Sequence, residues 1–140
     1  AGEFDLLLSV KHDLWAADPA KAAALTAIPA RLVLASWQDA TVAQATIAVG
    51  VRCWAEARGT MVNCQERIQV LGACPVLPNP ALEPAWQVLA RLAGLSWSGE
   101  AEAFKAAQAR SPRLAGLSYR AIGPQGRVLA PAAVPAAVGA

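Results

Sequence analysis

The chain has 140 residues, of which 56% are hydrophobic and 16% charged, and its formal net charge is +2. This length fits one domain with a core of its own, and the scattered basic residues exclude the positively charged stripe typical of nucleic-acid-binding surfaces. The longest apolar runs fall short of the ~20 residues of a membrane-spanning helix, and no basic segment followed by an apolar run indicates a signal peptide. We therefore expect no direct membrane insertion.

Residues 1–58 predict a partial α/β domain. Apolar runs that indicate buried strands occupy Phe4–Val10, Ala30–Ser36 and Ala45–Val51. Between the first two runs, Asp18 and Pro19 are suited to start a helix over Lys21–Ala27. After the second run, Asp39 is suited to cap a short helical turn. This alternation of strand and helix favours a small parallel sheet of about three strands with flanking helices, a partial Rossmann-like domain.

Residues 59–80 predict an extended crossover arm followed by a proline-rich linker. The segment Glu56–Gln69 (EARGTMVNCQERIQ) opens on an Arg-Gly turn and then places Asn63, Gln65 and Arg67 at every second position. That weak alternation is typical of an edge strand or an extended arm. The stretch CPVLPNP that follows contains three prolines and therefore excludes a helix.

Residues 81–130 predict two helices and a loop or hairpin. The pattern over Ala81–Leu95 places Trp86, Leu89, Leu92 and Ala93 on one helical face, with Gly94 as the C-cap. A second helix is expected over Ser98–Arg110, with acidic residues in its first turns. The turn residues Gly123, Pro124 and Gly126 then indicate a loop or hairpin. Residues 131–140 are expected to form a flexible tail.

Five tryptophans and three cysteines constrain the interpretation further. The tryptophans are expected to anchor the core or an interface, because each can bury about 150–250 Å². The cysteines, Cys53, Cys64 and Cys74, lack the short spacing of zinc or iron–sulphur ligands. Their odd number also argues against a disulfide framework. We therefore expect free thiols and no metal site in this segment, with a reactive thiol left as the alternative.

Two candidate sites can be read from titratable residues. His12, the single histidine, stands beside Asp13 at the end of the first strand, where open α/β sheets gather ligands. Glu56 and Glu66 could act as paired carboxylates if the fold brought them together. The simpler interpretations are a solvated loop histidine and surface ion pairs of both glutamates with Arg58 and Arg67. No glycine-rich phosphate-binding motif occurs in the sequence.

Residues 31–69 resemble a segment of the molybdopterin-oxidoreductase superfamily. The segment reads RLVLASWQDATVAQATIAVGVRCWAEARGTMVNCQERIQ, and the positions that follow the family pattern are Thr41, Ala45, Ile47, Val49, Glu56, Gly59, Thr60, Asn63, Arg67 and Gln69. Downstream, EPAWQVLARLAGL is similar to a Pro-x-Trp helix of that family. LAGLSYRAIGPQG is similar to a carboxy-terminal segment of one branch, the large iron–sulphur subunit of the proton-pumping NADH–quinone oxidoreductase, respiratory complex I.

The resemblance implies a carboxy-terminal, structural part of such a subunit, without a catalytic residue or a bound cofactor of its own. The iron–sulphur clusters would lie in an amino-terminal part not included here. The partners would be the rest of the subunit and other complex I subunits, with a cytoplasmic location peripheral to the membrane. The family positions Thr41, Gly59, Thr60, Asn63 and Arg67 would be vestiges of a cofactor motif. In isolation, the open edges of a small sheet favour a homodimer.

Departures from the family pattern support a scaffold that has lost its cofactor. Relatives that bind the pterin carry Gly-x-Asn-Pro after the first strand, where this chain has Lys11, His12, Asp13 and Leu14. Loss of the glycine hinders close approach of the backbone to a cofactor. Two alternatives remain open: a fragment of a molybdenum or tungsten enzyme such as a formate dehydrogenase, and a free-standing interaction module.

Overall fold

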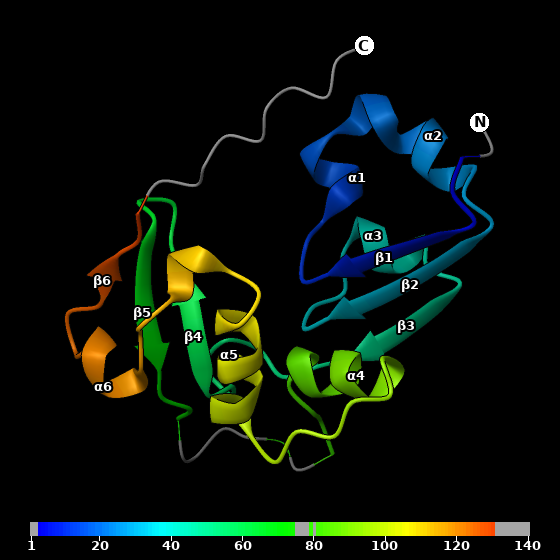
Figure 1. Ribbon diagram of the computed structural model, residues 1–140. Helices are drawn as coiled ribbons and strands as arrows, with labels where there is room; N and C mark the ends of the chain where they lie inside the picture. Colours follow the sequence, from blue (N-terminus) through cyan, green and yellow to red (C-terminus); the bar gives the residue numbers. More distant parts are fainter. Residues whose placement is uncertain (1–2, 75–78, 80, 131–140) are drawn as a thin grey trace.

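The computed structural model describes residues 3–74, 79 and 81–130. It contains two separate three-stranded sheets, one parallel and one antiparallel, each flanked by helices (Figure 1). The expected mixed α/β class with a three-stranded parallel sheet is therefore confirmed. The expected flexible tail and most of the proline-rich linker lie outside the described residues.

The parallel sheet has the strand order β1-β2-β3, formed by β1 (Leu6–Val10), β2 (Ala30–Ala35) and β3 (Ile47–Gly50). Its register aligns Leu8 with Leu32 and Leu32 with Ile47, so these side chains share one face. The three strands coincide with the three apolar runs of the sequence. Continuous apolar runs form such strands because a parallel sheet is usually covered on both faces.

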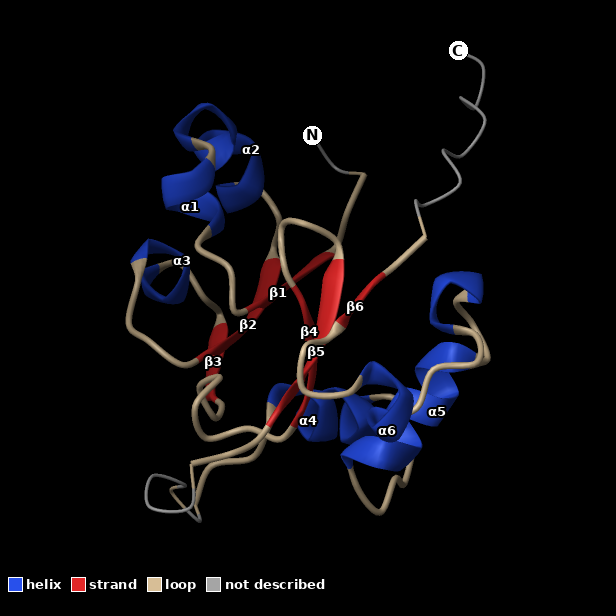
Figure 2. Cartoon of the chain, turned by 90° about the vertical axis from the view of Figure 1, so that its left-hand side faces the viewer, coloured by secondary structure: helices blue, strands red, loops and turns tan. Residues whose placement is uncertain are grey.

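The crossover connections carry short helices on one face of this sheet (Figure 2). They are α1 (Leu14–Ala17), the 3₁₀ turn η1 (Pro19–Lys21), α2 (Ala22–Thr26) and α3 (Ala40–Ala43). The carboxylate of Asp39 accepts from the amide of Val42 and caps α3, as predicted. Asp18 and Pro19 start a helical turn as predicted, because Asp18 stands at the N-cap position of η1, but the Asp18 side chain makes no capping hydrogen bond. Asp18 instead forms an ion pair with Lys21 at 2.7 Å.

The second sheet is antiparallel. It consists of β4 (Gly59–Val62), β5 (Arg67–Leu71) and the short β6 (Arg127–Val128), in the order β4-β5-β6. Where the sequence indicated one extended arm, the chain therefore turns back on itself between Asn63 and Glu66. Glu66 adopts a positive φ of 58°, which lets a four-residue turn close without glycine.

The remaining helices cover the two sheets. They are α4 (Ala85–Leu92), α5 (Glu100–Gln108), the 3₁₀ turn η2 (Pro112–Leu114) and α6 (Tyr119–Ile122). The predicted buried face of α4 was partly wrong, because Val88 is buried whereas Leu92 is 61% exposed. The first turn of α5 follows the predicted acidic pattern, and the Glu102 carboxylate accepts from the Ser98 amide and hydroxyl at 2.8 Å each.

Two small apolar clusters form the core, one beneath each sheet. Leu34 and Val51 pack with Val88 of α4 under the parallel sheet. In the antiparallel half, Ile68 of β5 packs with Phe104 of α5 and Ile122 of α6. Partly buried neighbours extend each cluster, and the described residues show these two clusters in place of one continuous core.

The tryptophans do not anchor either core, and this part of the prediction was wrong. None of the five is buried in the described chain, and Trp37 and Trp54 are 72% and 64% exposed. Aliphatic side chains and the ring of Phe104 fill the cores instead. The alternative that the tryptophans mark an interface stays a prediction.

None of the helices within the described ranges is long and apolar enough to span a membrane.

Candidate functional site

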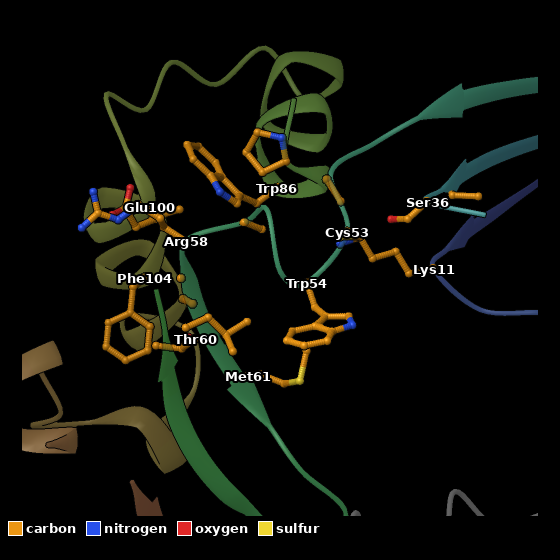
Figure 3. Close-up of a pocket in the computed structure, with 18 of the residues that line it drawn as sticks. Lys11, Ser36, Cys53, Trp54, Arg58, Thr60, Met61, Trp86, Glu100 and Phe104 are labelled. Atoms are coloured by element: carbon orange, nitrogen blue, oxygen red, sulfur yellow. The ribbon is translucent and has the colours of Figure 1, made fainter. Parts of the chain in front are cut away.

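A pocket of about 550 Å³ opens where the two sheets approach each other. Its lining comes from the carboxyl ends of β1 and β2, from β4, and from α4 and α5 (Figure 3). The carboxyl edge of an open parallel sheet is where such folds gather ligands. The pocket is therefore the candidate functional site.

Lys11 lies at the sheet end of the pocket. Its backbone adopts φ 53°, in the left-handed region that few lysines occupy, and its amide donates to the Leu34 carbonyl at 2.8 Å. Partial desolvation lowers the pKa of the Lys11 ammonium, while the neighbouring Cys53 and Glu56 act in the opposite direction. No carboxylate of the described residues lies within 4.0 Å of this ammonium.

Cys53 and Glu56 form a compact turn beside Lys11. The Glu56 carboxylate accepts from the Cys53 amide at 2.9 Å and from the Asn79 amide at 3.4 Å. Hydrogen bonds from the Cys53 backbone and side chain lower the pKa of Glu56, against an opposing contribution from desolvation. Glu56 therefore holds the turn that presents Cys53 to the pocket.

The opposite end of the pocket carries a second polar group. The Arg58 guanidinium lies 3.8 Å from the Glu100 carboxylate, which is a loose ion pair. Burial raises the pKa of Tyr119, and Glu100 adds to this effect while Arg58 opposes it. The Tyr119 hydroxyl is buried and has no hydrogen-bond partner among the described residues. Its ring packs on Phe104 with centroids 5.5 Å apart.

The candidate pair of His12 with Asp13 is not found, and the exposed His12 agrees with the simpler interpretation of a solvated loop histidine. The Asp13 carboxylate instead accepts from the Thr41 hydroxyl at 2.9 Å and the Ala16 amide at 3.2 Å. Desolvation acts to raise the pKa of Asp13, but these hydrogen bonds outweigh it and hold the pKa below its ordinary value. Asp13 thus caps α1 and binds Thr41.

Glu56 and Glu66 are also held apart. Glu66 forms an ion pair with Arg113, and Glu56 faces Cys53 and Asn79. The predicted pairing of both glutamates with Arg58 and Arg67 was therefore wrong. Arg58 faces Glu100, and the Arg67 guanidinium donates to the Gln125 carbonyl at 3.1 Å.

The family-motif positions divide into two groups. Gly59 and Thr60 lie at the start of β4 and line the pocket. Thr41, Asn63 and Arg67 instead bind the chain's own backbone. Thr41 is fully buried and accepts from the Leu14 amide at 2.7 Å, and the Asn63 side chain accepts from the Arg67 amide at 3.0 Å.

The three cysteines are free thiols, as predicted. Cys64 is exposed at the hairpin turn, and Cys53 and Cys74 are half-buried. Within residues 3–74, 79 and 81–130, no three side chains of His, Cys, Asp or Glu gather in a way that could hold a metal ion. The expected absence of a metal site in the whole segment stays a prediction.

Sequence reasoning did not identify the pocket itself. Its polar groups, Lys11, Cys53, Arg58 and Tyr119, come from three separate stretches of the sequence and belong to no shared motif. The one available signal was the rule that ligands bind beyond the carboxyl ends of parallel strands, which applies to Lys11. No family model matches this chain, and no curated protein matches it either.

Proposed function

We propose that this chain is a non-catalytic scaffold domain of a large iron–sulphur subunit of the complex I type, which supports electron transfer from NADH to quinone. One observation carries the proposal: three side chains of the implied former cofactor motif now form hydrogen bonds within the chain. These are the side chains of Thr41, Asn63 and Arg67.

These hydrogen bonds hold the fold at its connections. The Thr41 hydroxyl joins α3 to the start of α1, and Asn63 closes the turn between β4 and β5 with bonds from the Gln65 and Arg67 amides. Arg67 ties β5 to the turn before β6. Side chains engaged in this way are positioned to stabilise the chain and not to bind a ligand.

The residues at the pocket do not fit a pterin cofactor of the wider superfamily. The turn after β1 presents Lys11 where pterin-binding relatives have glycine, and its side chain lines the pocket wall. Asp13 and Leu14, farther along the same turn, are bound to Thr41. The backbone approach that a glycine permits is therefore closed, and a scaffold agrees better with the site than a molybdenum or tungsten enzyme.

An uncovered apolar face supplies a surface for packing against the rest of a subunit. Helix α4 covers only the carboxyl half of its face of the parallel sheet, where Leu34 and Val51 are buried. On the amino half of the same face, Leu6, Leu8 and Ile47 are 58%, 44% and 61% exposed. Contiguous exposed apolar side chains of this kind mark interaction surfaces.

The test is to purify the native protein that carries this sequence, with its associated subunits, from the cytoplasmic side of the membrane. Elemental analysis by mass spectrometry would then measure iron, molybdenum, tungsten and zinc, with the 140-residue chain measured alongside. The proposal expects iron in the parent protein, neither molybdenum nor tungsten, and no metal in the isolated chain. Stoichiometric molybdenum or tungsten would make this segment part of an enzyme's active-site wall. If the native protein consisted of this chain alone, the alternative of a free-standing interaction module would be favoured over the scaffold proposal.

A further inference from the structure

The pocket between the two sheets has the dimensions of a small-molecule site. Its volume of about 550 Å³ lies within the range of roughly 300–1,000 Å³ that is usual for such sites. Apolar and aromatic side chains, among them Trp54, Trp86 and Phe104, dominate its lining, with a few polar groups between them. This combination is typical of a site that binds the flat body of a ligand and orients it by one or two charges.

Among the charged side chains of the pocket, one ammonium is available to contact an anionic group of a ligand. Four charged side chains line it: Lys11, Asp39, Arg58 and Glu100. Asp39 is engaged as the cap of α3, and Arg58 and Glu100 face each other at 3.8 Å. Lys11 is left as the cation that forms no ion pair with a described residue. The four lining charges sum to zero, and the Glu56 carboxylate acts on Lys11 from beside the pocket. A single ammonium without a surplus of positive charge favours a monoanion over a doubly charged phosphate.

The aromatic side chains indicate the shape of the ligand body. In the close-up, Trp86 and Trp54 lie on opposite sides of the pocket, while Lys11 lies at one end and Arg58 with Glu100 at the other (Figure 3). Flat aromatic rings pack favourably on tryptophan faces and edges. The buried, unpartnered hydroxyl of Tyr119 in the wall is a further polar atom that a ligand could satisfy.

From this geometry we infer that the pocket binds a small, flat aromatic monocarboxylate, with the carboxylate on the Lys11 ammonium and the rings between Trp54 and Trp86. This site goes beyond the proposed scaffold role and does not depend on it. A charge-assisted hydrogen bond to the ammonium would orient the ligand, and the aromatic contacts would supply the apolar area.

The experiment measures binding of three matched probes to the complete 140-residue chain. The probes are 2-naphthoate, its neutral analogue 2-naphthamide and its phosphate analogue 2-naphthyl phosphate, studied by calorimetry and by amide chemical shifts. We expect 2-naphthoate to bind most tightly, with shifts concentrated on residues of the pocket. The neutral amide should bind about tenfold more weakly, because it loses one charge-assisted hydrogen bond.

Variants separate the charge contact from the aromatic contact. Lys11→Gln should weaken 2-naphthoate about tenfold and leave 2-naphthamide unchanged, whereas Lys21→Gln, on the surface away from the pocket, should change neither. Trp54→Leu, at a position already 64% exposed, should fold normally and weaken both probes alike. The inference is overturned if 2-naphthoate does not bind at millimolar concentration or if the phosphate binds more tightly. Equal binding of carboxylate and amide, or normal binding by Lys11→Gln, would overturn it as well.

Discussion

Thr41 is a buried polar residue whose hydrogen bonds join α3 to the start of α1 in the α/β half. Its hydroxyl accepts from the amide of Leu14 at 2.7 Å and donates to the carboxylate of Asp13 at 2.9 Å, and the side chain is fully buried. Replacement by valine keeps the shape and leaves these partners without a hydrogen bond. We expect Thr41→Val to lower the free energy of unfolding by about 1–3 kcal/mol, measured by urea denaturation.

Thr41→Ser is the matched control for this prediction. Serine keeps the hydroxyl and loses one methyl group, so its cost should be near the 0.8 kcal/mol or so of one buried methylene-sized group. If serine destabilises the chain as much as valine does, packing of the methyl group and not hydrogen bonding is what makes this position matter. The same result would weaken the scaffold proposal, which depends on the structural use of Thr41.

Asp13 makes stability depend on pH. Its folded-state pKa is held below the ordinary value of 3.8, so ionised Asp13 stabilises the fold above that pH. As pH falls below about 4 and through the lower folded-state pKa, the stabilisation is lost. We expect Asp13→Asn to be less stable than wild type at neutral pH and to lose less stability between about pH 6 and pH 3. Parallel urea midpoints for the two proteins across that range would contradict the prediction.

At the scale of elements, Gly126 determines whether β6 can join the second sheet. It has a φ of 69°, and an added Cβ would lie 2.5 Å from the Ile68 carbonyl oxygen. Gly116 has a similar φ of 73° but open space around it, which makes it a matched control. Gly116→Ala should cost about 1–2 kcal/mol from backbone conformation alone. Gly126→Ala should cost clearly more, because the strand must also move away from β5.

Amide hydrogen exchange would locate the effect of these two variants. Faster exchange in Gly126→Ala is expected at Leu129, whose amide donates to the Glu66 carbonyl at 2.8 Å. The Gly116→Ala variant should keep the exchange rate of that amide close to wild type. Equal losses of stability in both variants, without a change at Leu129, would show that close backbone approach at Gly126 is unimportant.

The strands of the parallel sheet could be predicted from the sequence, but the second sheet could not. Runs such as Ala30–Ala35 are apolar throughout apart from Arg31. Such a run indicates a buried strand even when the neighbouring strands are unknown. The hairpin was missed because its turn has Glu66 in place of glycine at the positive φ, which left Asn63 as the one turn-favouring residue type in the turn. Helix α1 has four residues, too few to show a period. The pocket depends on which elements meet, and sequence spacing does not contain that information.

At the scale of the whole molecule, the direction of the crossovers explains the exposed apolar face. In the order β1-β2-β3, each strand is added on the same side of the one before it. Because both crossovers are then right-handed in the same direction, their helices lie on the same face of the sheet. Of the helices in the described part of the chain, α4 alone lies on the other face, and it is too short to cover it. Leu6, Leu8 and Ile47 therefore remain exposed however well the crossover helices pack.

This uncovered face should make the isolated chain self-associate as its concentration rises. Lysine at Leu6 and Ile47 would place two charges on the face, and burial of an unpaired charge in an interface is strongly unfavourable. We expect Leu6→Lys with Ile47→Lys to remain monomeric in sedimentation velocity at concentrations where wild type associates. The control, Ala101→Lys with Ala109→Lys, adds the same charge at exposed positions beside the second sheet and should associate like wild type. If both double variants become monomeric, net charge is the cause; if neither does, association uses another surface, such as the open edge of β1.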